Sequence, residues 1–430
     1  MNCRGSIKVA VPLAIVAFCL FGHTFSRYCG ICHEFEAALL SVRWMLLLWI
    51  IVWCGSLFLL KFSVNDFPLI GLLLIATASC FIGDAASQPS ANAIILLAGV
   101  TLGKGARAFL EKSGKRPTAP KRGESEEAAV GSFLIGLVVL LAFSSWWHLD
   151  MTNNLYQGPR WMGLWNDPNI YGMLIGAGLL LAIGLLAVKQ KPEVGSQKSG
   201  KDSRNLSLRI FLFIAAGMMA LGLVFSYSRG AWFGTAVGLL YLAKTHGKFK
   251  WRFVLPGIFV IMAVVCLFWH STSDTAPWYL KRLDFSRPSA QHRVAAWRGS
   301  FQMMRDHPFG VGWNKAAVVY EKNYLPHEGG AAAITMNSYL MLGTELGLPA
   351  LLCFIAYIFF KFKANVADSL QVTCRAGALV LIVAFWFDGG LFDLPTAAVF
   401  WILLELGTSP PQCFTHLEAR AASAKAEMSA

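Results

Sequence analysis

The sequence predicts an all-α fold, that of a polytopic integral membrane protein. The first observation is composition: 56% of the 430 residues are hydrophobic and only 14% are charged, whereas a soluble domain carries about 25% charged residues. The second is a mean hydropathy of +0.54. The third is a series of apolar segments, each near the length of about 20 residues that crosses a bilayer. Too few charges remain to coat soluble domains, which excludes a soluble enzyme, a secreted disulfide scaffold and a disordered protein.

About twelve segments have the composition of transmembrane helices. They are 8–22, 42–60, 68–86, 91–106, 129–147, 169–188, 207–226, 229–245, 252–270, 337–360, 374–388 and 390–407. The first has the basic start and apolar core of a signal peptide, but Ser26-Arg27-Tyr28 is a poor cleavage site, so it is counted as a helix. The last pair is interrupted by Asp388 and Asp393.

The basic residues predict the orientation. Lys and Arg gather in segments 107–128 and 189–209, and short segments of this kind stay cytoplasmic. Both termini are then cytoplasmic. The expected organisation is transmembrane helices 1 to 9 in residues 1–270, a periplasmic loop with amphipathic helices in 271–336, transmembrane helices 10 to 12 in 337–407 and a disordered cytoplasmic tail in 408–430. The net charge of +13 is therefore mainly a topology signal, so we expect membrane lipids and no nucleic acid as partners.

The long loop 271–336 contains a predicted amphipathic helix at 289–305. Apolar residues recur at helical spacing on one face of it: Val294, Trp297, Phe301 and Met304. Arg293 lies one turn before Trp297, at a spacing that allows a cation–π contact. The alternative is an interfacial helix whose arginines extend to the headgroups. The helix is expected to stop at Asp306-His307-Pro308.

A second feature is the short connection Ser226 to Trp232, where two apolar segments meet as a tight hairpin. Ser226 or Ser228 is a suitable cap for the second helix. The free N–H groups of that helix start, beside Arg229, favour an anion site. An ordinary arginine at the headgroup level explains the pattern equally well.

Two further clusters flank predicted helices. Arg160 precedes Asp167-Pro168-Asn169, and the tryptophans around it are typical of a membrane interface belt. Asn337 begins the tenth predicted helix and Glu345 lies within it. An acid inside a membrane helix indicates either a functional site or pairing, and we favour pairing with a basic group or with backbone donors.

Cys29-Gly30-Ile31-Cys32-His33 matches the attachment pattern of c-type haem. It stands alone in a short outer loop with no evident second ligand. An outer disulfide or free thiols are the preferred interpretation of Cys29 and Cys32.

Taken in order, these motifs resemble the O-antigen ligase/polymerase superfamily of bacterial envelope glycosyltransferases. The matching pieces are Asp167-Pro168-Asn169, Ser228-Arg229-Gly230-Ala231-Trp232, Arg293 to Trp297, Asp306-His307-Pro308, Gly310-Val311-Gly312, and Asn337-Ser338-Tyr339-Leu340 running into Glu345-Leu346-Gly347. The resemblance implies a GT-C-like membrane glycosyltransferase of the bacterial inner membrane whose active site faces the periplasm. It implies transfer of a glycan from undecaprenyl diphosphate to lipid A core, another glycan or protein. It also implies a metal-independent reaction with two arginines at the diphosphate.

The sequence departs from the family at one position. Ligases of the family typically carry His directly before the Asn of the tenth-helix motif, and here that residue is Met336. The nearest upstream histidine is His327, followed by Glu328. Ligase and polymerase activities therefore both remain open.

The chemistry of the residues agrees with this resemblance. No nucleotide sugars are available outside the inner membrane, so a donor there is lipid-linked, and its leaving diphosphate needs cations. The sequence has no Asp-x-Asp metal motif, and arginine binds phosphate oxygens in bidentate fashion.

We therefore expect an inverting transfer with no cofactor and no metal. The expected catalytic residues are Arg229, Arg293 and His327, with Arg160 as a third diphosphate-binding residue. His327 is the first candidate for the base, and Glu328 and Asp306 are the next. Asn337, Glu345 and Asp306 are expected to support the acceptor or the loop.

Two other classes of protein remain as alternatives. A secondary transporter would also have about twelve spans, with Glu345, Asp388 and Asp393 along its path, but it would more often show two matching halves. A haem-carrying membrane redox protein is the other, and it depends only on Cys29, Cys32 and His33.

Overall fold

The computed structural model describes ten stretches of the chain: residues 9–21, 63–80, 91–114, 122–146, 160–165, 167–188, 198–246, 288–325, 337–366 and 368–408. Regular structure in these stretches is helical throughout, as the all-α prediction requires. The predicted helices at 42–60 and 252–270 and nearly all of the predicted tail at 408–430 lie outside the described residues.

Four of the described helices are long and apolar enough to cross a membrane: Asn92–Glu111 within α5 (Ala91–Gly114), Glu127–Ser145 within α6 (Arg122–Trp146), α7 (Pro168–Ala187) and Leu206–Ser226 within α8 (Lys198–Ser226). Shorter apolar helices are Val9–Phe21, α4 (Phe67–Ser79), α16 (Ser369–Ala384) and α17 (Leu394–Leu406). The chain is a multi-pass membrane protein. The count of twelve spans stays a prediction.

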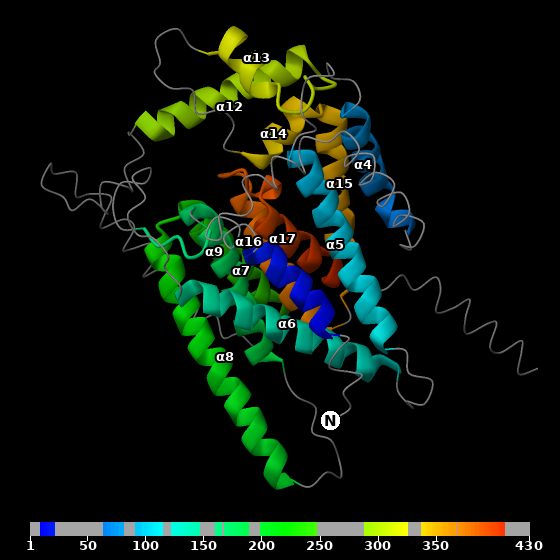
Figure 1. Cartoon of the computed structure of the whole chain (residues 1–430), viewed down its shortest axis with the longest axis vertical. Helices are drawn as coiled ribbons and strands as arrows, with labels where there is room; N and C mark the ends of the chain where they lie inside the picture. The colour runs from blue at the N-terminus through cyan, green and yellow to red at the C-terminus, as the bar shows by residue number, and fades with distance from the viewer. Residues whose placement is uncertain are drawn as a thin grey trace, which may run out of the picture.

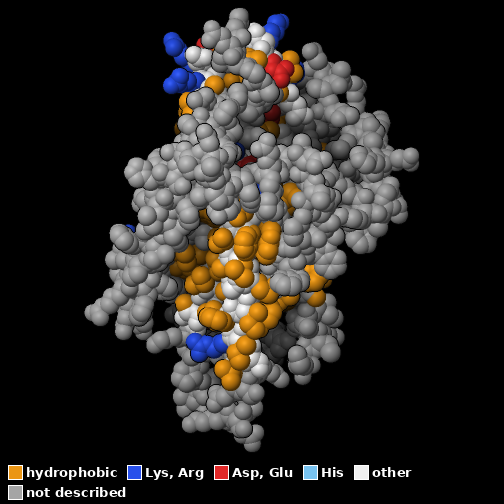
Figure 2. Space-filling model, turned by 90° about the vertical axis from the view of Figure 1, so that its left-hand side faces the viewer, with side chains coloured by type: hydrophobic (Ala, Val, Ile, Leu, Met, Phe, Trp, Pro, Cys, Tyr) orange, Lys and Arg blue, Asp and Glu red, His pale blue; other side chains and the backbone are white. Residues whose placement is uncertain are grey.

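Helix α7 lies in the middle of the bundle, between α8 on one side and α16 on the other (Figure 1). It is buried along most of its length, with 78% of its apolar window inside the protein. By contrast α8 exposes Phe213, Ile214 and Leu221. On that side the described side chains over the middle of the molecule are mostly hydrophobic (Figure 2), as expected for a surface that meets lipid tails.

Glycines let α9 (Arg229–His246) approach α16 closely. Gly230, Gly234 and Gly238 recur every four residues, and a Cβ on Gly238 would lie 2.8 Å from the carbonyl oxygen of Ala376 in α16. This spacing of small residues is typical of closely packed helices in membranes. It fixes the beginning of α9 against the segment that follows α16.

The predicted span 337–360 is wrong as a single helix. The structure has two helices there, α14 (Ser338–Glu345) and α15 (Leu348–Lys363), separated at Leu346-Gly347. Gly347 has φ +89°, a left-handed conformation that only glycine adopts easily. The N–H of Leu348 bonds to the carbonyl of Pro308 (2.8 Å) and not to a helical partner.

A layer beyond one end of the bundle holds α12 (Pro288–Asp306) and α13 (Ala316–Asn323), which lie above α14 (Figure 1). We call this the α12 end. The helix α12 corresponds to the helix predicted at 289–305. Between α12 and α13 the chain returns to the bundle, where Trp313 donates its ring N–H to the carbonyl of Ala76 at the end of α4 (3.0 Å). The layer is thereby attached to the membrane helices.

Candidate functional site

The candidate site is built around residues 385–393, the connection between α16 and α17. Its backbone is held by Ser338, the first residue of α14. The Ser338 N–H donates to the carbonyl oxygens of Phe385 (2.9 Å) and Asp388 (3.2 Å), and the Ser338 hydroxyl donates to Asp388 O (2.8 Å). The N–H of Leu391 in turn donates to that hydroxyl (3.2 Å). The beginning of α14 therefore fixes the shape of the connection.

Helix α12 brings Arg293 to the same connection. Its Nη1 donates to the carbonyl oxygen of Phe387 (3.1 Å). One turn later the Trp297 ring packs edge-on against Trp386, with centroids 5.9 Å apart. The Arg293 guanidinium also interacts electrostatically with the Asp388 carboxyl. The first described turns of α12 are thus fastened over Phe387 and Asp388.

The start of α7 forms another side of the site. The Asp167 carboxyl caps the helix and accepts hydrogen bonds from the N–H groups of Asn169 (2.7 Å) and Ile170 (3.4 Å). The Asn169 side chain accepts a bond from Arg160 Nη2 (3.1 Å) and also bonds to the Asp388 carboxyl. Asn169 therefore links an arginine of one segment to an acid of another.

Arg160 is only 7% exposed, and its Nε donates to the carbonyl of Ser226 (2.8 Å), the last residue of α8. The neighbouring backbone contacts the end of α8 as well, because the Trp161 N–H donates to the carbonyl oxygen of Phe225 (3.0 Å). Arg160 thus ties the α8–α9 hairpin to the start of α7.

The α8–α9 hairpin is as tight as the sequence predicts. The Ser228 N–H donates to the Ser226 hydroxyl (3.2 Å), and Tyr227 turns the chain with φ +50°. Arg229 is the first residue of α9 and is partly buried. A Cβ on the next residue, Gly230, would lie 2.8 Å from the Phe387 Cβ. The start of α9 and the side chain of Arg293 therefore converge on Phe387.

Three carboxyl groups lie near one another at this point: those of Asp167, Asp388 and Asp393. Burial, and then the negative charge of Asp167, raise the pKa of Asp388 to about 6, although Arg293 acts in the opposite direction. The same two causes raise the pKa of Asp393 to about 7. At neutral pH an acid of this kind exchanges protons readily.

The other predicted residues have defined places. Asn337 is fully buried and caps α14, accepting from the N–H groups of Tyr339 (2.9 Å) and Leu340 (3.2 Å). Glu345, at the end of α14, bonds to the Asn314 N–H and the Asn92 side chain. Backbone donors were one of the two partners expected for it.

Asp306 is exposed at the opposite end of α12 from Arg293, about 20 Å away along the helix. Its carboxylate accepts from the Tyr324 hydroxyl (2.8 Å), which joins the ends of α12 and α13. His327 and Glu328 lie outside the described residues, as do Cys29, Cys32 and His33 of the haem-like pattern.

Sequence reasoning did not place Asp388, Asn169 or Ser338 together in this site. Asp388 stood out as an acid that interrupts an apolar segment and, in the transporter alternative, as an acid along the transport path. Acids between two apolar segments were the one available signal, because the contacts join parts of the chain separated by up to about two hundred residues.

These arginines and carboxyls gather at one end of the membrane bundle, from the starts of α7 and α9, from α12 and from the connection between α16 and α17. Residues 214–355 match the family model described as O-antigen ligase. These residues, about a third of the chain, form an O-antigen ligase domain within a multi-pass membrane protein, and this match indicates the class, a membrane glycosyltransferase-like enzyme. The match includes Arg229, Arg293, Asn337 and Glu345, while Arg160 and Asp388 lie outside it. A search of curated proteins found no match.

Proposed function

We propose that the protein transfers a glycan from an undecaprenyl-diphosphate-linked donor to an acceptor at the periplasmic face of the bacterial inner membrane. The reaction is inverting and metal-independent, and it serves lipopolysaccharide or exopolysaccharide biosynthesis. The observation that carries the proposal is the position of Arg293. This arginine, within the O-antigen ligase match, binds the Phe387 carbonyl directly beside the buried Asp388.

The arginines serve the leaving group. When the bond between the anomeric carbon and the diphosphate oxygen breaks, negative charge develops on that oxygen. Arg293 from α12 donates to the Phe387 carbonyl, and the start of α9, which carries Arg229, packs on Phe387 through the neighbouring Gly230. The guanidinium groups of both arginines offer paired donors to phosphate oxygens. Arg160, the third diphosphate candidate, is largely committed to Ser226 and Asn169 and so holds the hairpin in place.

The acceptor hydroxyl needs a base. Among the described residues, Asp388 is placed for this role because its carboxyl lies beside Arg293 and Asn169. It takes the proton while the acceptor oxygen forms its bond to the anomeric carbon on the face opposite the departing diphosphate. A single displacement of this kind inverts the configuration. His327, with Glu328, stays a predicted alternative base.

An experiment decides which class of acceptor the protein uses. Met336 stands where ligases of the family carry histidine, so lipid A core and a second lipid-linked glycan are both tested. Purified protein is mixed with undecaprenyl-diphosphate glycan and each acceptor, and the products are sized. A ladder indicates a polymerase and a single addition indicates a ligase.

A matched donor makes the test specific. The same glycan on undecaprenyl monophosphate lacks the second phosphate that the arginines bind. We expect transfer from the diphosphate and at least about a hundredfold less from the monophosphate, the effect of losing a charge-stabilising interaction. Equal transfer from both, or none from the diphosphate with any acceptor, contradicts the proposal.

Orientation is tested separately. The proposal requires the α12 end to face the periplasm. Reporter fusions after residues 200 and 320 should lie on opposite sides of the membrane, with 320 outside. Both reporters on one side would remove the periplasmic site and the lipid-linked donor with it.

A further inference from the structure

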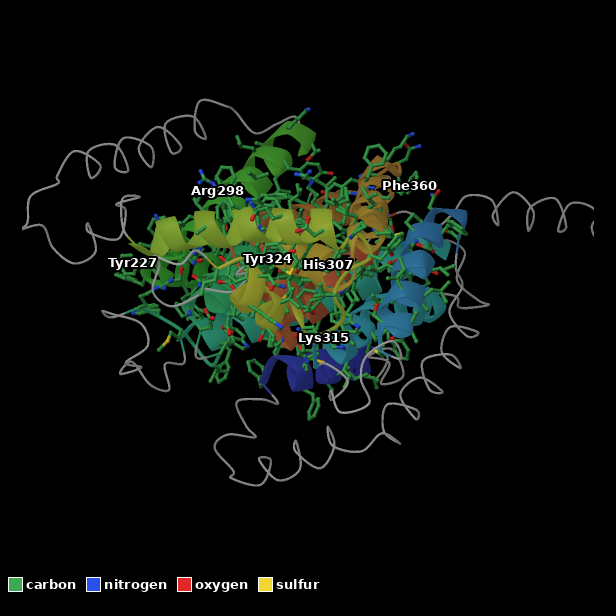
Figure 3. The ribbon with its side chains drawn as sticks, turned by 90° about the horizontal axis from the view of Figure 1, so that it is seen from above. Tyr227, Arg298, His307, Lys315, Tyr324 and Phe360 are labelled. Carbon is green, nitrogen blue, oxygen red and sulfur yellow. The ribbon has the colours of Figure 1, made fainter. Side chains whose placement is uncertain are left out.

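Helix α12 exposes one narrow stripe of side chains, which we call the α12 stripe: Val294, Arg298, Phe301 and Arg305. Spacings of four, three and four residues place all of them on one side of a helix. Phe301 is 53% exposed and Val294 45%, and both arginines are exposed. Seen from above, α12 crosses the molecule with Arg298 at its edge (Figure 3).

The stripe does not face the hydrocarbon core. Its helix packs on α13 and α14 through the opposite side, where Met303 is fully buried, and it lies beyond the ends of the membrane helices (Figure 1). Val294 and Phe301 are exposed together between two arginines, and an exposed apolar patch rimmed by polar residues commonly marks a binding surface. The charges on the stripe are all positive. Asp306, the acid of this helix, lies off the stripe and accepts from Tyr324.

The stripe is continuous with the candidate site. Arg293, which reaches Phe387, and Arg305 are separated by about 18 Å along the helix. Trp297 lies between Arg293 and Phe301 on the helix surface, and its ring packs on Trp386 of the site. A glycan whose reacting end is held at Arg293 therefore has α12 as its neighbour.

We propose that the α12 stripe binds acidic sugar residues of the glycan substrate. Arg298 and Arg305 bind carboxylate or phosphate groups carried by the sugars, and Phe301 packs against the apolar face of a sugar ring. This inference rests on the proposed function and adds the substrate class: a glycan that carries uronic acids or phosphates. A donor glycan and an acceptor glycan offer the same chemistry.

The first experiment needs no turnover. The full-length protein is placed in nanodiscs of zwitterionic lipid, and binding of a galacturonic acid hexamer is compared with that of a neutral glucose hexamer. We expect the acidic hexamer to bind more tightly. The double variant R298A/R305A should weaken its binding about tenfold, in keeping with two exposed charge contacts, and Phe301→Ala should weaken it less.

Matched controls come from elsewhere on the surface. Lys322→Ala removes an exposed cation of the neighbouring α13, and Arg209→Ala removes one from α8; neither should change hexamer binding. The proposal is overturned if R298A/R305A binds as wild type does, or if both hexamers bind equally. A third outcome also overturns the proposal: nanodiscs of anionic phosphatidylglycerol abolish hexamer binding by the wild type but leave that of R298A/R305A unchanged. The stripe would then bind lipid headgroups.

A second arm separates donor from acceptor and tests transfer. One reaction pairs an acidic donor glycan with a neutral acceptor, and the other reverses the charges. In R298A/R305A we expect KM to rise about tenfold for the acidic partner, with kcat kept. An unchanged KM in both reactions contradicts the inference. If no reaction occurs even in wild type, the proposed function fails, while hexamer binding still tests the stripe.

Discussion

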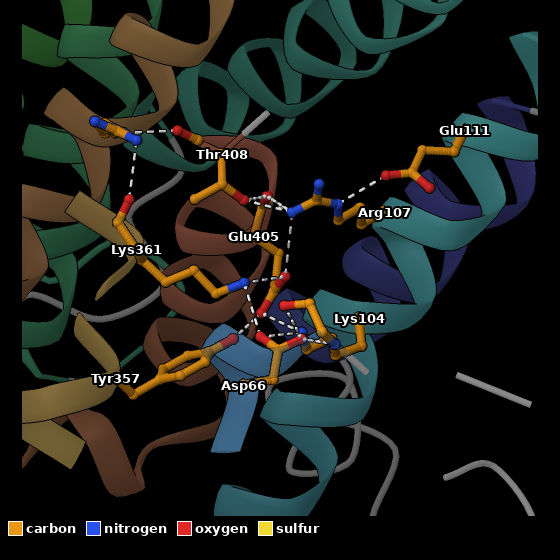
Figure 4. A network of polar contacts seen from close by, with 11 residues as sticks. Asp66, Lys104, Arg107, Glu111, Tyr357, Lys361, Glu405 and Thr408 are labelled. Atoms are coloured by element: carbon orange, nitrogen blue, oxygen red, sulfur yellow. Dashed lines mark hydrogen bonds and ion pairs between the residues drawn. The ribbon is translucent and has the colours of Figure 1, made fainter. Parts of the chain in front are cut away.

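Charged side chains cluster near both ends of α17, and the two clusters differ in kind. At the end opposite α12, Asp66, Lys104, Lys361 and Glu405 form a closed network (Figure 4). Lys104 Nζ lies 2.8 Å from Asp66 and 3.3 Å from Glu405, and Lys361 Nζ lies 3.1 Å and 3.0 Å from the same two carboxylates. Asp66 meets these two cations, Glu405 also meets Arg107 at 3.7 Å, and the side chains of Asp66, Lys104, Lys361 and Glu405 are at most 7% exposed.

Neighbouring groups complete this network. Tyr357 donates its hydroxyl to Glu405. Arg375 of α16 donates to four backbone carbonyls that end α15 and α17: Lys361, Phe362, Ala364 and Gly407. The network joins the beginning of α4, the second half of α5, the first half of α16 and the ends of α15 and α17. This is an arrangement for holding helices in place.

The α12 end shows the contrary pattern. Three carboxyls, those of Asp167, Asp388 and Asp393, face one another there, and Arg293 bonds to a backbone carbonyl. Like charges held close together destabilise the folded protein, and such unfavourable arrangements are found mainly at functional sites. The comparison predicts that variants at the first end affect stability and that variants at the second affect chemistry.

The largest effect is expected for Glu405→Ala. It leaves Lys104 and Lys361 buried beside a single acid, and breaking a buried pair costs about 3–5 kcal/mol. The thermal unfolding of detergent-solubilised protein measures this, and much of the variant should fail to accumulate. The matched control is Glu111→Ala, which removes a surface partner of Arg107 that is 36% exposed and should cost at most about 1 kcal/mol. Equal melting temperatures for wild type and Glu405→Ala would show that the network is not a structural clamp.

The next effect concerns chemistry at the other end. Arg293→Ala and Arg229→Ala should each lower glycan transfer about a hundred- to a thousandfold, the cost of removing a preorganised donor to developing charge. Lysine at either position keeps the charge without the paired donors and should restore only part. Melting temperatures should stay near that of wild type, with Arg209→Ala as the control in both assays. Near-full transfer by both alanine variants would leave headgroup-level arginines as the better interpretation.

The sequence predicted more of the structure at the α12 end than at the opposite end. The residues of α7 and α12 and the positions of Arg229 and Arg293 were predicted because helical periodicity and short motifs are local signals. The network of Asp66, Lys104, Lys361 and Glu405 was not predicted. These residues lie on separate elements, and nothing in the sequence near any one of them indicates its partners. The break at Gly347 was missed for a similar reason, since a distant carbonyl, that of Pro308, replaces the helical partner.

The pH dependence should separate Asp388 from its neighbours. With a pKa of about 6, a base is lost on protonation, so transfer should fall about tenfold per unit below pH 6. Stability should move the other way: a raised pKa favours the protonated folded form, so stability declines as pH rises from the ordinary value of 3.8 through about 6. Rates from pH 5 to 8 test this. Asp388→Asn should be slow and flat with pH, whereas Asp393→Asn should keep the acid limb. An unchanged limb in Asp388→Asn would favour His327 as the base.

The smallest expected effect is that of a chelator, and it completes the comparison. The carboxyls of Asp167, Asp388 and Asp393 are the natural place for a divalent cation at the α12 end. Yet in the described stretches no three His, Cys, Asp or Glu side chains are grouped to hold one, and Arg229 and Arg293 offer fixed charge for the diphosphate in its place. Transfer in defined proteoliposomes should therefore be the same with and without EDTA. Activity that vanishes with EDTA and returns with Mg²⁺ or Mn²⁺ would contradict this. In that event Asp393→Asn should weaken the metal response, and a cation held by the acids, in place of the arginines, would stabilise the diphosphate.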